Sequence, residues 1–254
     1  MIVNTHMHTK YSDGKNSLRQ MLKKSITIGY DLIAFSDHVR KSSDWVADYA
    51  SEILKCKENF RGKIRILTSL EAKVIGFNKK IDISKNDLKK LDFLIASVHS
   101  VPLNYSGRKR ANVVEGYNGK LIRLESPVSK EELIEFWERA TLAIIESKEA
   151  DVLGHPFRIP FLLNVKIRES TVRKIYEEAK INEKIVEIST KYKNERKYIK
   201  ILRKIRPMIL IGSDSHSLQE LAKTYKINKK YSLMFKKEIR SALENVFEKH
   251  HSKI

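Results

Sequence analysis

The segment Leu32-Ile33-Ala34-Phe35-Ser36-Asp37-His38 is a short apolar run that ends in an acidic residue and a histidine. Its apolar part has the length and composition of a buried β-strand. A histidine just past a short apolar run recurs along the chain, and this placement accounts for six of the eight histidines: His6, His8, His38, His99, His155 and His216. Only His250 and His251, near the C-terminus, fall outside the pattern. Imidazoles at the same end of successive parallel strands converge in space.

Seven apolar runs alternate with amphipathic segments. We expect strands at 1–6, 32–36, 64–74, 93–98, 151–154, 185–189 and 208–213. We expect helices near 17–28, 43–59, 84–90, 130–148, 168–181, 194–205, 217–225 and 233–249. Capping boxes are expected at Ser17 and Ser129, and helix C-caps at Gly29 and Gly62. Because each return between parallel strands needs a helix, the pattern predicts an α/β fold, a seven-fold or incomplete barrel in one domain, 1–254.

One segment, residues 100–128, breaks this alternation. It contains three glycines and the basic cluster Arg108-Lys109-Arg110, and it shows no clear helical pattern. A loop of this length inside a compact domain is typically functional. Because it directly follows His99, we expect it to lie over the mouth of the histidine site as a lid.

The composition points to polyanions without deciding the partner. Lys and Arg number 50 against 31 Asp and Glu, which gives a formal charge of +19. Such an excess favours nucleic acids, nucleotides or phosphorylated metabolites, although a Lys- and Ile-rich proteome would produce the same balance. The single cysteine, Cys56, predicts a reducing, cytoplasmic location. We expect no membrane association, because no apolar run approaches about 20 residues.

The histidines are accompanied by carboxylates at matching positions. The H-x-H pair His6 and His8 lies on an extended segment, so both imidazoles point to one side. The candidate metal ligands are His6, His8, Asp13, His38, Glu71, His99, His155, Asp214 and His216. One histidine alone would be read as a core or strand-end residue, but the repeated placement indicates a metal site. Nine ligands suit two or three divalent ions rather than one.

The ordered series His-x-His, Tyr-Ser-Asp-Gly, Ser-Asp-His, Ser-Val-His-Ser, Gly-His-Pro and Gly-Ser-Asp-Ser-His resembles the PHP (polymerase and histidinol phosphatase) family. The resemblance implies a distorted seven-stranded (β/α)7 TIM-like barrel, here as a stand-alone domain. It also implies three groups of metal ligands. The first is His6, His8, Glu71 and Asp214; the second is Glu71, His99 and His155; the third is Asp13, His38 and His216. Asp37 is not a usual ligand, and either a supporting role or a solvent-facing turn suits it.

This constellation favours metal-assisted phosphoester hydrolysis. Two or three divalent ions can activate water and neutralise phosphoryl charge, and the family's activities agree. Neither a P-loop nor a Ser-His-Asp or Cys-His arrangement occurs in the sequence. His216 or Asp13 is the candidate for assisting proton transfer. The ligand types accept Zn, Mn or Fe, so the sequence does not identify the metal.

Cationic residues are candidates for binding the phosphate. Arg158 follows His155 by three residues and suits bidentate phosphate contact, and the resemblance implies an arginine near this place. Arg108 and Lys191 are further substrate-binding candidates. Weaker ones are Lys109, Arg110 and Arg123.

Three functions remain open from sequence. The preferred one is a phosphomonoesterase of the histidinol-phosphatase type, because the chain is one compact domain with a lid candidate. The alternative is a phosphodiesterase or 3′–5′ exonuclease, with Tyr105, Tyr117 or Phe157 stacking on bases. The third is a non-catalytic, metal-stabilised binding subunit. The substrate is a phosphorylated small molecule or a nucleic acid, and the oligomeric state is open.

Overall fold

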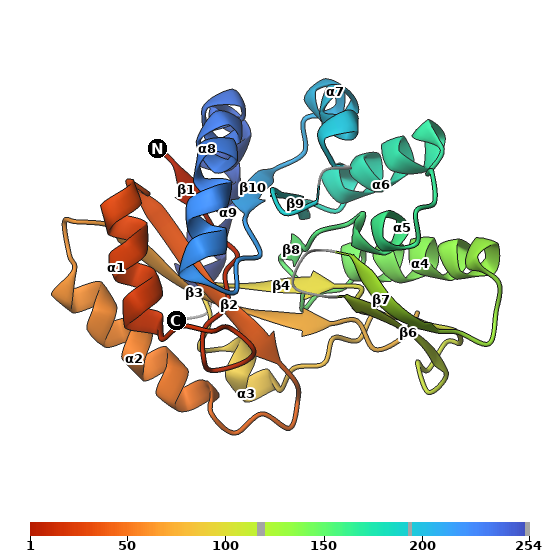
Figure 1. Ribbon diagram of the computed structural model, residues 1–254, viewed down its shortest axis with the longest axis horizontal. Coiled ribbons are helices and arrows are strands. Elements are labelled where there is room, and N and C mark those ends of the chain that lie inside the picture. Colours follow the sequence, from red (N-terminus) through yellow and green to blue (C-terminus); the bar gives the residue numbers. More distant parts are fainter. Residues whose placement is uncertain (116–119, 193–194, 252–254) are drawn as a thin grey trace.

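The computed structural model describes residues 1–115, 120–192 and 195–251. Its main sheet has seven parallel strands in the order β1-β2-β3-β4-β8-β9-β10 (Figure 1). The strands are β1 (Val3–Asn4), β2 (Leu32–Val39), β3 (Arg65–Lys73), β4 (Phe93–Ser97), β8 (Val152–Leu153), β9 (Ile185–Ser189) and β10 (Ile209–Gly212). All seven coincide with the expected runs. β2 continues past the expected end at residue 36, so His38 lies on the strand, where it pairs in register with Glu71 of β3.

The first and last strands meet and close the sheet into a barrel. The Thr5 N–H donates to the Ile211 carbonyl at 2.8 Å, and the Asp214 N–H donates to the His6 carbonyl at 2.9 Å. Met7 and Ser215 form a parallel bridge beyond these bonds. The predicted seven-stranded TIM-like barrel is therefore confirmed, and its closing seam runs through the H-x-H segment.

Helices cover the outside of the barrel (Figure 1). They are α1 (Leu18–Ile28), α2 (Val46–Asn59), α3 (Lys85–Leu88), α4 (Lys130–Ile145), α5 (Arg158–Leu162), α6 (Glu169–Ile181), α7 (Glu195–Ile205), α8 (Leu218–Met234) and α9 (Lys236–His251). Both capping boxes form, at Ser17 and Ser129. No helix within the described residues is both long and apolar enough to span a membrane.

Three helix expectations are wrong in detail. Gly29 ends α1 in the left-handed conformation as expected, but α2 is capped by Phe60, and Gly62 lies in the turn that follows. The expected helix at 217–225 continues to Met234, because Leu221 and Tyr231 lie on the same buried side of α8. The short helix α5, which carries Arg158, was not expected at all.

Residues 100–128, for which the sequence predicted a long loop, contain three strands. They form an antiparallel sheet of β5 (Ser100–Pro102), β6 (Arg110–Glu115) and β7 (Leu121–Glu125). Arg110 anchors this small sheet: its guanidinium donates to the carbonyl oxygens of Val74 and Ser100, both at 2.8 Å. Arg110 is therefore a structural residue and not a phosphate ligand. The alternation of Val101, Ala111 and Val113 toward the core explains why the segment forms strands.

A buried lysine at the start of β9 makes the stability of the barrel depend on pH. Lys184 is 6% exposed, and its Nζ donates to the carbonyl of Ser147 at 2.8 Å and to that of Ala150. Burial lowers the pKa of Lys184 to about 8, although Asp151 partly opposes the shift. Between pH 8 and about 10.4 the unfolded chain therefore binds more protons than the folded protein.

We expect the free energy of unfolding to gain up to about 3 kcal/mol from this group as the pH rises through that window. The gain is complete above the unfolded pKa and is lost as the pH falls through 8. Urea denaturation at several pH values would measure it. Lys184→Met should flatten the curve relative to the unmodified protein, and an identical pH slope in the two proteins would contradict the assignment.

Candidate metal centre

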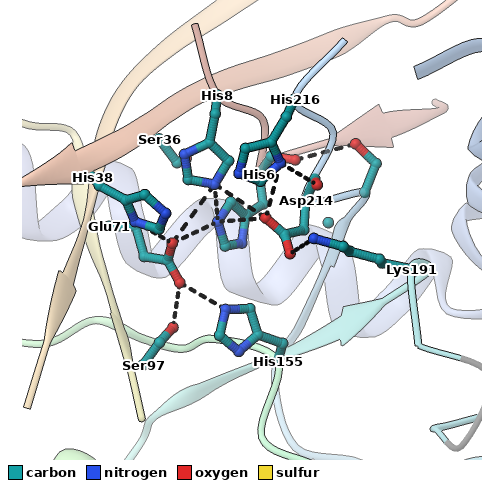
Figure 2. A network of polar contacts seen from close by, with 12 residues as sticks. His6, His8, Ser36, His38, Glu71, Ser97, His155, Lys191, Asp214 and His216 are labelled. Atoms are coloured by element: carbon teal, nitrogen blue, oxygen red, sulfur yellow. Dashed lines mark hydrogen bonds and ion pairs between the residues drawn. The ribbon is translucent and has the colours of Figure 1, made fainter. Parts of the chain in front are cut away.

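The carboxyl ends of the strands bring the nine sequence-predicted ligands to one end of the barrel. Figure 2 shows seven of them: His6, His8, His38, Glu71, His155, Asp214 and His216. Two of them, His155 and Asp214, have φ angles of 23° and 47°, in a backbone region that costs a non-glycine residue about 1–3 kcal/mol. Both follow strands directly, β8 and β10. The local strain turns the chain so that these side chains point back over the barrel mouth. Such strain persists where the surrounding structure fixes it, typically at a functional site.

Glu71, buried in β3, lies at the centre of the cluster. Its Oε1 is 2.8 Å from Nε2 of both His99 and His155 and accepts a hydrogen bond from Ser97 at 2.6 Å. Its Oε2 is 3.2 Å from Nε2 of His6 and 3.0 Å from Nδ1 of His38. One carboxylate thus contacts imidazoles from four separate segments of the chain, as expected of a ligand that two ions share.

A second group forms beside it around Asp13. The Asp13 carboxylate lies 3.8 Å from Nδ1 of His8, 3.6 Å from Nε2 of His38 and 3.4 Å from Nε2 of His216. His8 therefore lies between the first and third predicted groups, since its Nε2 is also 3.1 Å from Oδ1 of Asp214. Nitrogen and oxygen atoms of His8, Asp13, His38 and His216 lie within 4.8 Å of one another.

Asp37 holds the loop that carries Asp13. It is fully buried and accepts hydrogen bonds from the Thr9 N–H at 2.7 Å and from the hydroxyls of Thr9 and Ser12 at 2.8 and 2.7 Å. The solvent-facing alternative is therefore wrong for Asp37. Gly14 lets the same loop pass close to the first strand, because a Cβ there would lie 2.6 Å from the His8 carbonyl carbon.

Sequence reasoning missed Glu187, a buried carboxylate in β9. Its Oε1 is 2.9 Å from Nδ1 of His6, and its Oε2 accepts the His155 N–H at 2.6 Å. A Cβ on Gly212 would overlap Glu187, so the glycine in β10 makes room for this carboxylate. The available signal was an acidic residue in the middle of the apolar strand Ile185-Val186-Glu187-Ile188-Ser189. By accepting a hydrogen bond from Nδ1–H of His6, Glu187 leaves the Nε2 lone pair of His6 facing the cluster.

The charges in the cluster shift the pKa values of its carboxyl groups downward. Burial by itself would raise the pKa of Glu71, but His99, His6 and the other imidazoles hold it well below its usual range. Burial would likewise raise the pKa of Asp214, but the cation of Lys191, which is the main opposing charge, holds this pKa well below its usual range. Both are therefore ionised at neutral pH, which is the form that binds metals.

The imidazoles divide into two kinds. Burial, reinforced by His216 and His38, lowers the pKa of His8 well below its usual range, and burial lowers that of His99 to about 4. For His216 burial also acts downward, but the carboxylates of Asp13 and Asp214 outweigh it and raise its pKa to about 9. His8 and His99 are therefore neutral near pH 7, as a ligating imidazole must be.

The donor atoms fit divalent cations. Nε2 of His6 and Nε2 of His8 lie 3.1 Å apart, facing the same Glu71 oxygen. Among the buried atoms of the described residues, Glu71 Oε2, His8 Nδ1 and His155 Nδ1 accept or donate no hydrogen bond. Nitrogen and oxygen lone pairs that converge without a proton between them repel one another unless a cation lies among them. The set of imidazoles and carboxylates suits Zn, Mn or Fe.

A cavity of about 320 Å³ opens above the cluster. Its lining comprises Asp13, His38, His99, Glu115, Ile122, His155, Arg158, Lys191, Asp214, His216 and Glu220. Arg158 and Lys191 thus reach the site as the sequence predicted, while Glu115, Ile122 and Glu220 were missed. Burial opposes the charge of Lys191, but Asp214 and Glu115 outweigh it and raise the pKa of the ammonium.

Other candidates lie away from this cavity or are committed to packing. Arg108 and Lys109 are exposed in the β5–β6 turn, and neither lines the cavity as the structure describes it. Arg123 pairs with Glu125 at 3.1 Å beside a second cavity. Phe157 is 1% exposed and packs against Trp137 and Tyr198, so it cannot stack on a base. Tyr105 is exposed, and Tyr117 lies outside the described residues.

Comparison with known proteins identifies the family. A family model, the PHP domain, matches residues 4–204. The chain belongs to the PHP domain family. A probable phosphatase of Acetivibrio thermocellus is 23% identical over 239 residues, which cover 90% of this PHP-domain chain and 85% of that relative.

Two solved structures share the fold. One is histidinol phosphate phosphatase from Lactococcus lactis in complex with zinc, L-histidinol and phosphate, with a TM-score of 0.59, 20% identity, and coverage of 89% of this chain and 93% of that one. The other is a proposed histidinol phosphatase from Listeria monocytogenes, with a TM-score of 0.69, 15% identity, and coverage of 89% and 99%. At these identities the likeness concerns the PHP fold.

Proposed function

We propose that this PHP-domain protein is a metal-dependent phosphoesterase that hydrolyses a phosphomonoester of a small molecule. The observation that carries the proposal is the convergence of six imidazoles and three carboxylates beneath a cavity that also presents Arg158 and Lys191. The Acetivibrio relative, named a probable phosphatase, and the Lactococcus structure with zinc and phosphate support the same reaction class.

Two or three divalent ions, Zn, Mn or Fe, would be held by the nine donors. His6, His8, Glu71 and Asp214 form one group, and Glu71, His99 and His155 form a second around the opposite carboxylate oxygen. Asp13, His38 and His216 form the third, with His8 close to it. When bound, such ions supply Lewis acidity, which makes water acidic enough to give a nucleophile near neutral pH and draws charge from phosphoryl oxygens.

The chain's own cations orient the phosphate in the cavity. Arg158 is 9% exposed and Lys191 is half-buried, and both face the space above Asp214. A guanidinium and an ammonium that are themselves largely shielded from water bind phosphoryl oxygens more strongly than they would at the open surface. Because both cations lie on the same side of the cavity, they hold the phosphate in one orientation. This orientation determines which bond of the ester faces the metal ligands.

His216 and Asp13 are placed to manage a proton. The His216 Nδ1–H donates to the Asp214 carbonyl at 2.9 Å, which leaves Nε2 facing Asp13 at 3.4 Å. Asp13 is on the exposed rim of the cavity, where the leaving group would depart. His216 or Asp13 is therefore our candidate for assisting proton transfer while serving as a metal ligand.

The decisive experiment measures hydrolysis of a panel by the metal-reconstituted protein. The panel contains histidinol phosphate, p-nitrophenyl phosphate, its bis ester, and labelled single-stranded DNA and RNA. We expect monoester turnover that His8→Ala reduces by at least about 100-fold, because that imidazole joins two ligand groups. Full metal occupancy with no turnover of any monoester would contradict the proposal.

A groove between α6 and α7 favours the phosphodiesterase or exonuclease function as a second candidate. The groove has a volume of about 750 Å³, and its lining holds six cations and one carboxylate, Glu169. The cations are Lys166, Arg168, Arg173, Lys197, Lys200 and Lys204. Packed helices lie about 8–10 Å apart, so the groove suits a single strand rather than a duplex. Shortening of the labelled oligonucleotides, with affinity that falls steeply with salt, would favour this candidate.

Two further parts of the proposal concern the location of the protein in the cell and the segment that covers the site. We keep a cytoplasmic location, supported by the single buried thiol Cys56. We also propose that the segment 100–128 covers the site as a lid, through the small sheet of β5, β6 and β7. Its Glu115 and Ile122 line the cavity, which supports this placement.

A further inference from the structure

Three donors converge on one carboxylate in the cavity. Glu115, the last residue of β6, receives a hydrogen bond from Nε of Arg158 at 2.7 Å and from the Tyr192 hydroxyl at 2.8 Å, both at its Oε2. Nζ of Lys191 lies 3.5 Å from its Oε1, which accepts no hydrogen bond. Two cations and a hydroxyl around one anion form a built anion site, and the protein's own side chain occupies it.

Two of the partners of Glu115 also contact Asp214, whose Oδ2 lies 2.9 Å from Nζ of Lys191 and 3.3 Å from the Tyr192 hydroxyl, so Arg158 is the partner that depends most on Glu115. Within the described residues, Glu115 is the only carboxylate within 4.0 Å of the Arg158 guanidinium, whose other contact is a long bond to the His99 carbonyl at 3.4 Å. A buried guanidinium without an anion is costly. Arg158 therefore needs either Glu115 or another anion in the same place.

The small sheet offers a way for Glu115 to leave. Arg110 fixes the near end of β6 to residues 74 and 100, whereas Glu115 holds the far end to Arg158. The ladder between β6 and β7 is irregular at Val114 and Glu115. β7 itself is mostly exposed. One end of the sheet is thus anchored by Arg110, and the other is held at Glu115 by its contacts with Arg158, Tyr192 and Lys191.

We propose that Glu115 is a latch which occupies the position of a substrate phosphoryl group and exchanges with it. The inference rests on the proposed function, because it assigns the regulation of that same site. A tetrahedral oxyanion that enters the cavity takes over the contacts to Arg158, Lys191 and Tyr192, and the far end of the sheet is released. Because the exchange is reciprocal, binding of the anion and opening of the latch assist each other. Glu115 is a positioning residue and does not touch the reacting atoms.

The test is Glu115→Gln in the metal-loaded protein, with inorganic phosphate as the probe. Glutamine keeps the shape and one acceptor oxygen but carries no charge that competes with phosphate. We expect titration calorimetry to give a dissociation constant for phosphate that is on the order of 10-fold lower. The KM for p-nitrophenyl phosphate should fall by a similar factor, while kcat should change by less than about threefold.

Several comparisons keep the result interpretable. Glu131→Gln, an exposed site in the first turn of α4, makes the same charge change and should leave phosphate affinity unaltered. Glu115→Asp keeps the charge but withdraws it by one methylene, and should give a smaller gain. Adding Arg158→Ala to Glu115→Gln should remove the gain, because the guanidinium that both anions share is then absent.

Unchanged or weaker phosphate binding in Glu115→Gln would overturn the latch, because it would mean that Glu115 only orients Arg158. The calorimetric readout does not require turnover. Tighter phosphate binding without hydrolysis of any monoester would therefore reject the proposed function and keep the latch. Hydrolysis of a monoester, with a phosphate affinity that Glu115→Gln leaves unchanged, would reject the latch and keep the proposed function.

Discussion

Glu71→Gln is expected to abolish phosphomonoester hydrolysis, with a loss on the order of 1,000-fold. The side chain keeps its volume, but one of its two oxygens becomes an amide NH2. Oε1 is shared by His99 and His155, and Oε2 faces His6, His8 and His38 at 3.0–3.6 Å. An amide nitrogen at either position points a donor at atoms that serve as metal ligands, and it also removes the charge that both groups share.

The measurement pairs steady-state rates with elemental analysis of bound metal. We expect at least one equivalent of metal to be lost together with activity, while Glu177→Gln, an exposed site on α6, retains both. Glu177 makes the control informative because it undergoes the same chemical change outside the barrel. If Glu71→Gln bound the full metal complement and hydrolysed monoesters normally, the central role of Glu71 would be refuted.

The elements that the sequence predicted share a physical cause. The buried parallel strands are continuous apolar runs, which are recognisable without knowledge of their neighbours. Their ligands directly follow or end these runs, as at Ser97-Val98-His99 and Gly154-His155. Parallel topology then places all of them at one end of the barrel. For this reason the seven parallel strands and the nine converging side chains could be predicted before any contact was known.

The features that escaped prediction depend on contacts between distant segments. The strands at 110–115 and 121–125 are short and partly exposed, and Arg110 ties the first of them to residues 74 and 100. Glu115 acquires its role from Arg158 and Lys191, which are 43 and 76 positions away in sequence. No local pattern marks such a residue. Its burial and its partners exist only in the folded chain.

Glu187 could be predicted only in part. Its position within an apolar strand was visible in the sequence, but the residues that it contacts were not. A buried carboxylate requires partners, and the sequence does not say which ones. The structure supplies two, Nδ1 of His6 and the backbone N–H of His155. Both partners belong to predicted metal ligands. Glu187 therefore connects the core of the barrel to two of the ligand groups at once.

Glu187→Gln is accordingly expected to weaken metal binding by about 10- to 100-fold and to lower the free energy of unfolding by about 2–3 kcal/mol. Glutamine can accept from only one of the two donors through its oxygen, and its NH2 group must then face the other donor, either Nδ1–H of His6 or N–H of His155. The imidazole of His6 loses its fixed orientation, or the strained turn at His155 loses its support. Metal titration and urea denaturation would measure the two effects.

Gly212→Ala disturbs the same contact, because its Cβ would overlap the Glu187 carboxylate and would also lie 2.7 Å from the Cβ of His6. If Glu187 acts by orienting His6 and His155, both variants should lose metal affinity. Metal affinity and stability that remain normal in Glu187→Gln would mean that His6 and His155 hold their positions through the cluster itself, which would leave Glu71 as the residue that organises both ligand groups.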